Sequence, residues 1–77
     1  MSEATLADRI VADPEICGGR PRIQGTRVRV SDILAALAAG DTADAIVESL
    51  PYVTHDDIRA ALHYAALSLD TKVAFAA

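Results

Sequence analysis

Cysteine is almost absent from this chain. Cys17 is the only one in 77 residues, so a disulfide within the chain is excluded. Metal-binding pairs are missing too, because no Cys-x-x-Cys or His-x-x-x-His spacing occurs, and His55 and His63 lie eight positions apart, too far to share one ion. We expect no metal and no cofactor, and we interpret Cys17 as a small buried hydrophobe. Small domains that have neither a disulfide nor a structural metal often gain stability by oligomerising, so we expect a homodimer.

Long apolar runs are also missing. The first residues contain acidic side chains and do not resemble a signal peptide, and no apolar stretch approaches the length that spans a bilayer. We therefore expect a cytoplasmic protein with no membrane partner. The length suits a single domain, 1–77, with an N-terminal strand region at 1–30, a helical bundle at 31–69 and a short tail at 70–77.

Catalytic groupings are missing as well. No serine or cysteine has a plausible base partner in the sequence, and Gly18-Gly19 lacks the Lys-Ser/Thr pair of a phosphate loop. Asp56-Asp57 is better explained as compensation of a helix dipole than as a catalytic pair. We expect no enzyme activity and no catalytic residue.

Positive charge is scarce overall and is gathered in one place. The net charge is −4, yet residues 1–40 carry five basic and five acidic side chains, whereas residues 41–77 carry two basic and six acidic ones. Between Gly18 and Val30 the sequence holds four arginines and no acid. An acidic protein does not attract nucleic acid with its whole surface, but this stretch can form a local basic face.

The same stretch has the turns and the alternation of a short β-ribbon. Gly18-Gly19 and Gln24-Gly25-Thr26 suit turns, and Pro21 suits the start of an edge strand. Apolar residues alternate with arginines between these turns, which predicts apolar side chains inward and arginines outward. The apolar positions are Ile23, Val28 and Val30. The residues expected to bind DNA are Arg20, Arg22, Arg27 and Arg29. Upstream, Ile10-Val11-Ala12 predicts another short strand, ended by Asp13-Pro14.

Three helices are expected after the ribbon. The first covers 32–39, with Ser31 as its N-cap and Gly40 just past its end. The second covers 43–49 or 43–50, begins after Asp41 or Thr42 and stops at Pro51. The third covers 55–69 and follows Thr54-x-x-Asp57, a near match to the capping box. The residues expected to face the core are Ile33, Leu34 and Leu37 in the first helix, Ala43, Ile46, Val47 and Leu50 in the second, and Ile58, Leu62, Ala65, Ala66 and Leu69 in the third.

The third helix has a second stripe at helical spacing on its other side. Its members are Ala60, His63, Tyr64 and Leu67. A helix that is apolar on two sides is usually covered on two sides, so we expect this stripe to be a dimer or partner interface.

Three short helices in this order suit a helix-turn-helix, and an ordinary three-helix bundle fits the pattern equally. Two aspartates, Asp56 and Asp57, stand at the start of the third helix and would repel phosphates. If DNA is bound, the arginine ribbon is therefore a better candidate than this helix.

The chain also resembles a known prokaryotic family. The resemblance rests on the motif Ile10-Val11-x-Asp13-Pro14-Glu15-Ile16-Cys17-Gly18-Gly19-x-Pro21-x-Ile23-x-Gly25-Thr26-Arg27-x-x-Val30, and on Pro51-x-Val53-Thr54-x-x-Asp57-Ile58 further on. This pattern is similar to a family long numbered as the four-hundred-and-thirty-third domain of unknown function and now regarded as antitoxin-like.

The resemblance implies a mainly α fold, a homeodomain-like helix-turn-helix of three helices preceded by a short β-ribbon and often dimeric. It further implies an antitoxin that binds a PIN-type ribonuclease toxin and its own promoter DNA, with Arg27 as the signature arginine. Many relatives carry proline where this chain has Arg29. The alternative hypothesis is a dimeric protein-interaction module that binds no nucleic acid.

Overall fold

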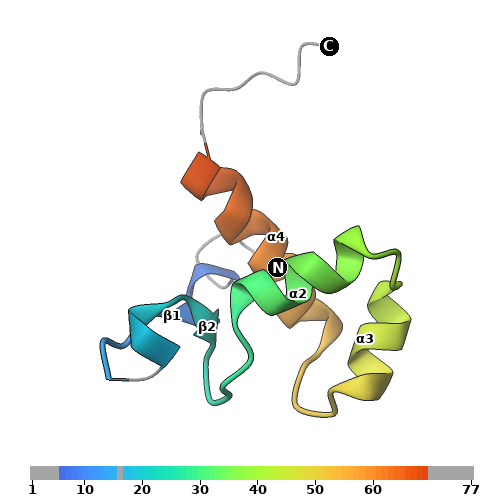
Figure 1. The fold of residues 1–77 in the computed structure, drawn as a ribbon, viewed down its shortest axis with the longest axis horizontal. Helices are drawn as coiled ribbons and strands as arrows, with labels where there is room; N and C mark the ends of the chain where they lie inside the picture. Colours follow the sequence, from blue (N-terminus) through green and yellow to red (C-terminus); the bar gives the residue numbers. More distant parts are fainter. Residues whose placement is uncertain (1–5, 16, 70–77) are drawn as a thin grey trace.

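Three helices follow a two-stranded antiparallel sheet in the computed structural model of this chain, which describes residues 6–15 and 17–69 (Figure 1). The predicted fold class, mainly α with a short β unit in front of three helices, is confirmed. The elements are β1 (Ile10–Val11), the 3-10 turn η1 (Cys17–Gly19), β2 (Arg22–Ile23), α2 (Val30–Ala38), α3 (Ala43–Ser49) and α4 (His55–Leu69). The predicted tail at 70–77 and the predicted burial of the Cys17 side chain lie outside what the structure describes.

The strand predicted at 10–12 exists and pairs with β2. Ile10 lies opposite Ile23, and Val11 lies opposite Arg22. The other edge of β2 is also occupied, because Arg22 forms an isolated bridge with Arg29 and the Ile23 N–H donates to the Val28 carbonyl over 2.8 Å. The sheet has two strands in the described part of the chain, so β2 is an edge strand as predicted, and the bridge to Arg29 occupies part of its outer edge.

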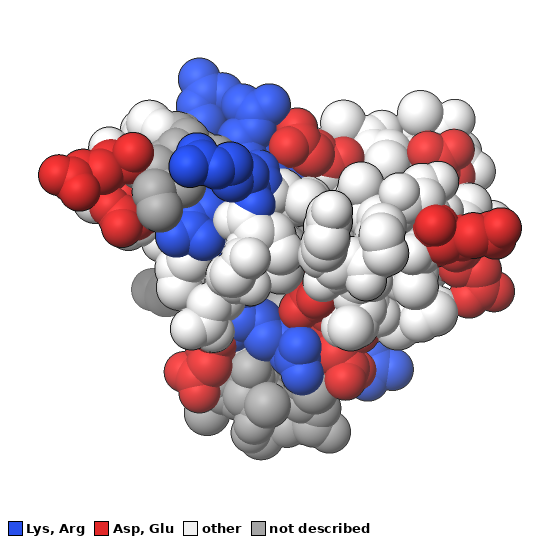
Figure 2. Space-filling view, turned by 90° about the horizontal axis from the view of Figure 1, so that it is seen from below, with Lys and Arg blue, Asp and Glu red and all other residues white. Residues whose placement is uncertain are grey.

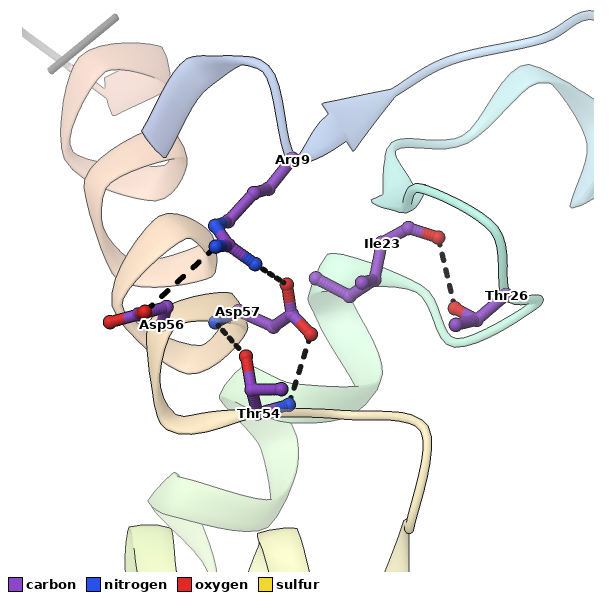
Figure 3. Close-up of polar contacts among 6 residues, drawn as sticks. All are labelled: Arg9, Ile23, Thr26, Thr54, Asp56 and Asp57. Carbon is purple, nitrogen blue, oxygen red and sulfur yellow. Dashed lines mark hydrogen bonds and ion pairs between the residues drawn. The ribbon is translucent and has the colours of Figure 1, made fainter. Parts of the chain in front are cut away.

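The turn predicted around Gly25 is confirmed and is held by one hydroxyl group. Gly25 has φ 80°, a left-handed conformation that a residue without a Cβ adopts at little cost. The Thr26 hydroxyl donates to the Ile23 carbonyl over 2.9 Å (Figure 3). The same hydroxyl accepts the Val28 N–H over 3.0 Å. These two hydrogen bonds hold the turn that connects β2 to the start of α2.

The first helix begins earlier than predicted. α2 starts at Val30 and its N-cap residue is Arg29, so the assignment of Ser31 as N-cap is wrong. The physical reason is Asp32, whose carboxylate accepts the Arg29 N–H over 3.2 Å and so satisfies a backbone donor one turn ahead. The end of α2 agrees with prediction, because Gly40 has φ 102° and its N–H donates to the Leu37 carbonyl over 3.0 Å.

The starts of the other two helices agree with the sequence. Thr42 caps α3 by accepting the Ala45 N–H over 3.1 Å. At α4 the capping box closes in both directions, since the Thr54 hydroxyl accepts the Asp57 N–H over 3.2 Å and the Asp57 carboxylate accepts the Thr54 N–H over 3.0 Å. Aspartate therefore replaces the usual glutamate in this motif without loss of either hydrogen bond.

The core is assembled from every part of the described chain. The buried cluster consists of Ile23, Val30, Ile33, Ile46, Val53, Ile58 and Ala61. On α3 the predicted face is confirmed, with Ile46 buried and its predicted companions half-buried. None of the helices in the described part combines the length and the apolar character needed to cross a membrane.

The predicted core face of α4 is wrong beyond its second turn. Ile58 is buried as expected, but Leu62 is 48% exposed and Leu69 is 85% exposed. α2, α3 and β1 all pack against α4, and the buried residues of this helix all lie between Asp57 and Ala61. In Figure 1 the C-terminal half of α4 extends beyond α2 and α3, which agrees with the exposure of Leu62 and Leu69.

Candidate functional site

The four arginines predicted to bind DNA, which we call the basic row, do not share one environment. Arg20 and Arg27 are exposed, Arg29 is half-buried and Arg22 is buried. The prediction that Arg22 points outward is wrong. Its side chain is 9% exposed, and its guanidinium donates from Nη1 to the carbonyl of Thr26 in the turn that follows the strand, over 3.0 Å.

Arg29 is engaged by the first turn of α2. Its Nη2 lies 3.0 Å from Asp32 Oδ1, and its Nε donates to the other carboxylate oxygen over 3.3 Å. These side-chain hydrogen bonds from Arg29 hold the pKa of Asp32 below its ordinary value of 3.8, partly offset by desolvation. The pair therefore ties the end of the basic row to the helix that follows it.

The pKa of Asp32 leads to a prediction about pH. We expect Asp32→Asn to lower the free energy of unfolding by about 0.5 kcal/mol at neutral pH, a small effect because both partners are more than a third exposed. A carboxyl whose folded pKa is lowered contributes stability above its ordinary pKa and loses it as the pH falls through the folded value. The difference between parent and variant should therefore shrink once the pH drops below 3.8. Urea titrations across the acid range measure this, with the exposed α3 substitution Glu48→Gln as control.

A groove lies between the turn after β2 and the loop that joins α3 to α4. It has a volume of 620 Å³, and we call it the turn–loop groove. Its lining residues are Arg22, Gly25, Thr26, Arg27, Val28 and Tyr52. Figure 2 shows basic side chains gathered on the side of the molecule that carries the β-sheet, while acidic side chains stand at the outer end of that side as well as at the opposite edge, where α3 lies. The lining itself contains no acidic residue.

A second groove runs between the start of α2 and the end of α4. It has a volume of 380 Å³, and we call it the α2–α4 groove. Its lining residues are Arg20, Pro21, Val30, Ser31, Leu34, Tyr64, Ala65, Ser68 and Leu69. Of the predicted interface stripe, Tyr64 is 36% exposed and Leu67 is 50% exposed, and His63 is half-buried. Ala60 is 1% exposed, so its assignment to an exposed interface is wrong.

A charged cluster that no sequence pattern predicted joins the N-terminal segment to α4 (Figure 3). Arg9 Nη1 lies 3.0 Å from Asp57 Oδ1, and Arg9 Nη2 lies 3.8 Å from Asp56 Oδ2. Asp57 is 8% exposed and also caps Thr54. Arg9 and Asp57 are 48 positions apart, so no local pattern could have paired them. Asp56 and Asp57, which the sequence analysis explained by the helix dipole, are thus also ion-pair partners of the half-buried Arg9.

The histidines do not form a metal centre in the described part of the chain. His55 Nε2 lies 2.6 Å from Asp44 Oδ1, which links the start of α4 to α3. No group of three or more histidine, cysteine, aspartate or glutamate side chains is close enough to hold a metal ion among the described residues.

Comparison with known proteins identifies relatives but no activity. The family described as "Protein of unknown function (DUF433)" matches residues 10–65. The uncharacterized protein y4eO of Sinorhizobium fredii is 37% identical over 62 residues, which are 80% of this chain and 28% of that protein. A solved structure of a DUF433 member protein from Anabaena variabilis is similar with a TM-score of 0.76 and 31% identity, over 83% of this chain and 63% of that one. The chain therefore spans only part of each of these relatives.

Proposed function

The chain belongs to the DUF433 family, and we propose that it acts as an antitoxin-like protein that binds a PIN-type ribonuclease toxin through the C-terminal half of α4. One observation carries this proposal. Between Arg59 and Asp70 the sequence has no aspartate, glutamate, lysine or arginine. Most of that stretch lies in a helix that projects from the bundle (Figure 1).

The exposed side chains of this segment are unusually large and apolar for a surface. They are Leu62, Tyr64, Leu67 and Leu69, with exposures from 36% to 85%. Leu62 and Leu69 lie on one side of the helix, and Tyr64 and Leu67 lie on the other, so this segment exposes apolar side chains on both sides. Exposed apolar surface marks sites of protein–protein contact, and an apolar helix commonly docks in a groove of its partner. The α2–α4 groove begins at the same residues, so a partner could contact the helix and the groove together.

We expect Leu67→Glu to abolish partner binding while the domain remains folded. Leu67 is half exposed and lies outside the buried cluster, so the substitution leaves the core intact. A central apolar anchor contributes about 2 kcal/mol or more, which corresponds to at least about a 30-fold loss of affinity. The measurement is co-purification with the product of the neighbouring gene, together with rescue from growth arrest.

Arg59→Ala is the matched control, since Arg59 is an exposed residue of the same helix outside the apolar segment. It should bind the toxin as the parent does. If the parent chain neither co-purifies with that product nor restores growth, the antitoxin proposal is wrong.

A second candidate function is a homodimeric interaction module that binds no nucleic acid. Burial of Arg22 and pairing of Arg29 with Asp32 favour it, because they reduce the cations available to a DNA duplex. Promoter binding, as part of the antitoxin proposal, would then depend mainly on the exposed Arg20 and Arg27. Sedimentation at tens of micromolar tests the dimer, and a monomer at that concentration would exclude this candidate.

A further inference from the structure

Arg22 is a buried cation without a carboxylate partner among the described residues. It is 9% exposed. Nη1 has the Thr26 carbonyl as its acceptor, whereas Nε is buried and has no hydrogen-bond partner. Burying a charge without an opposite charge carries a free-energy cost, which an anion near the guanidinium would offset.

The turn–loop groove gives an anion access to this buried charge. Arg22 forms part of its wall, and the exposed Arg27 stands on the same turn. Because the lining has no carboxylate and the walls are protein rather than water, the positive potential is concentrated inside the groove. Gly25 adds backbone with open space where a Cβ would stand, so this side of the groove is not narrowed by a side chain.

The opposite side of the groove provides an aromatic ring. Tyr52 lies in the loop between α3 and α4 and is 74% exposed, so its ring is not part of the core. Proteins bind unpaired nucleotides with this combination of an exposed aromatic ring and nearby arginines. The base stacks on the ring, and the cations hold the phosphate. The groove volume of 620 Å³ also lies within the range of small-ligand sites.

We propose that the turn–loop groove binds a nucleotide unit, with its phosphate toward Arg22 and Arg27 and its base on Tyr52. The unit is either a free mononucleotide or one nucleotide of a single strand. A duplex does not suit this site, because Arg22 is recessed and the bases of a duplex are already stacked on each other. This site lies on other residues than the apolar segment of α4, so it is independent of the toxin-binding proposal.

Calorimetry with three probes tests which part of the ligand is recognised. Adenosine monophosphate should bind, and inorganic phosphate and adenosine should each bind at least about fivefold more weakly, since each lacks one of the two contacts. Amide shifts on addition of the nucleotide should cluster at residues 25–28 and Tyr52. Equal binding of phosphate alone, or shifts confined to the α2–α4 groove, would overturn the proposal.

Variants separate the ring from the charge. Tyr52→Ala should weaken the binding of adenosine monophosphate by about fivefold or more. Tyr52→Phe keeps the stacking surface, so its affinity for the nucleotide should stay close to that of the parent. Arg22→Met removes the buried charge, and Arg27→Gln is an exposed substitution that tests the same cation role if the former fails to fold. Both substitutions should lower the affinity for the nucleotide. Arg59→Ala, which lies outside the groove lining, should leave that affinity unchanged.

A labelled eight-nucleotide oligouridylate distinguishes the two sources of the nucleotide. Tighter binding of this strand than of the mononucleotide, lost in Tyr52→Ala, identifies single-stranded nucleic acid as the ligand. Binding of the mononucleotide alone identifies a free nucleotide. A glutamate-rich peptide that binds as well as either, or a duplex whose binding is unaffected by Tyr52→Ala and lost in Arg20→Ala, would overturn the proposal.

Discussion

Asp57→Ala is expected to lower the free energy of unfolding by about 3 kcal/mol, because the substitution removes the buried partner of a part-buried ion pair and leaves the charge of Arg9 uncompensated. The substitution leaves the Arg9 guanidinium without its 3.0 Å partner and the Thr54 N–H without its acceptor. A domain of this length has a total stability of roughly 4–12 kcal/mol. The variant should therefore melt about 10–25 °C below the parent in thermal unfolding followed by circular dichroism.

Two further substitutions identify the cause of that loss. Asp56→Ala is the matched control, because Asp56 lies 3.8 Å from Arg9 and is 45% exposed, and it should cost less than about 1 kcal/mol. Asp57→Asn keeps an acceptor for the Thr54 N–H but removes the charge, so its effect should fall between the other two. If Asp56→Ala and Asp57→Ala are equally mild, the cluster contributes little and the buried pair is not what fastens the N-terminal segment.

Ile58→Ala is expected to destabilise the domain by about 2–5 kcal/mol, the usual cost of cutting a buried isoleucine back to alanine. Ile58 is 3% exposed and belongs to the central cluster. Leu62→Ala, one turn further along the same helix, should cost less than about 1 kcal/mol because Leu62 is 48% exposed. Denaturant unfolding of the two variants and the parent gives both values.

Comparing Ile58→Ala with Leu62→Ala also tests the point along α4 at which its side chains cease to be buried. Equal, large losses at both positions would mean that Leu62 is covered, for example by a second copy of the chain. In that case dilution should reduce the cost of Leu62→Ala but leave that of Ile58→Ala unchanged, since stability gained by association depends on concentration.

Local signals predicted the helices well because capping acts over three or four residues. Thr42 and Thr54 supply hydroxyl acceptors to helix starts, and Gly40 supplies the left-handed residue that ends α2. Ser31 was the exception. It has the right chemistry for an N-cap, but the Asp32 carboxylate reaches back to the backbone N–H of Arg29, and the helix begins two residues earlier than Ser31 suggests.

The basic row shows where a sequence pattern stops being informative. Alternation placed Arg22 on the face opposite Ile23, which is correct for a strand with one solvent-facing side. The pattern carries no information about what covers that second face. Here the turn at 24–28 folds back over β2 and supplies a carbonyl to the guanidinium, so the predicted surface cation became part of a groove wall.

The sequence by itself determined the order of the helices, the end of α2, the starts of α3 and α4, the turn at Gly25 and the uncharged end of α4, because each depends on neighbours along the chain. Only the tertiary structure decided that Arg9 pairs with Asp57, that the buried side chains of α4 end at Ala61, and that Leu62, Leu67 and Leu69 beyond it are exposed. Those outcomes depend on residues tens of positions apart and on which surfaces the packed elements leave uncovered. Periodicity records which side chains are apolar, but burial is settled by the presence of a neighbouring layer.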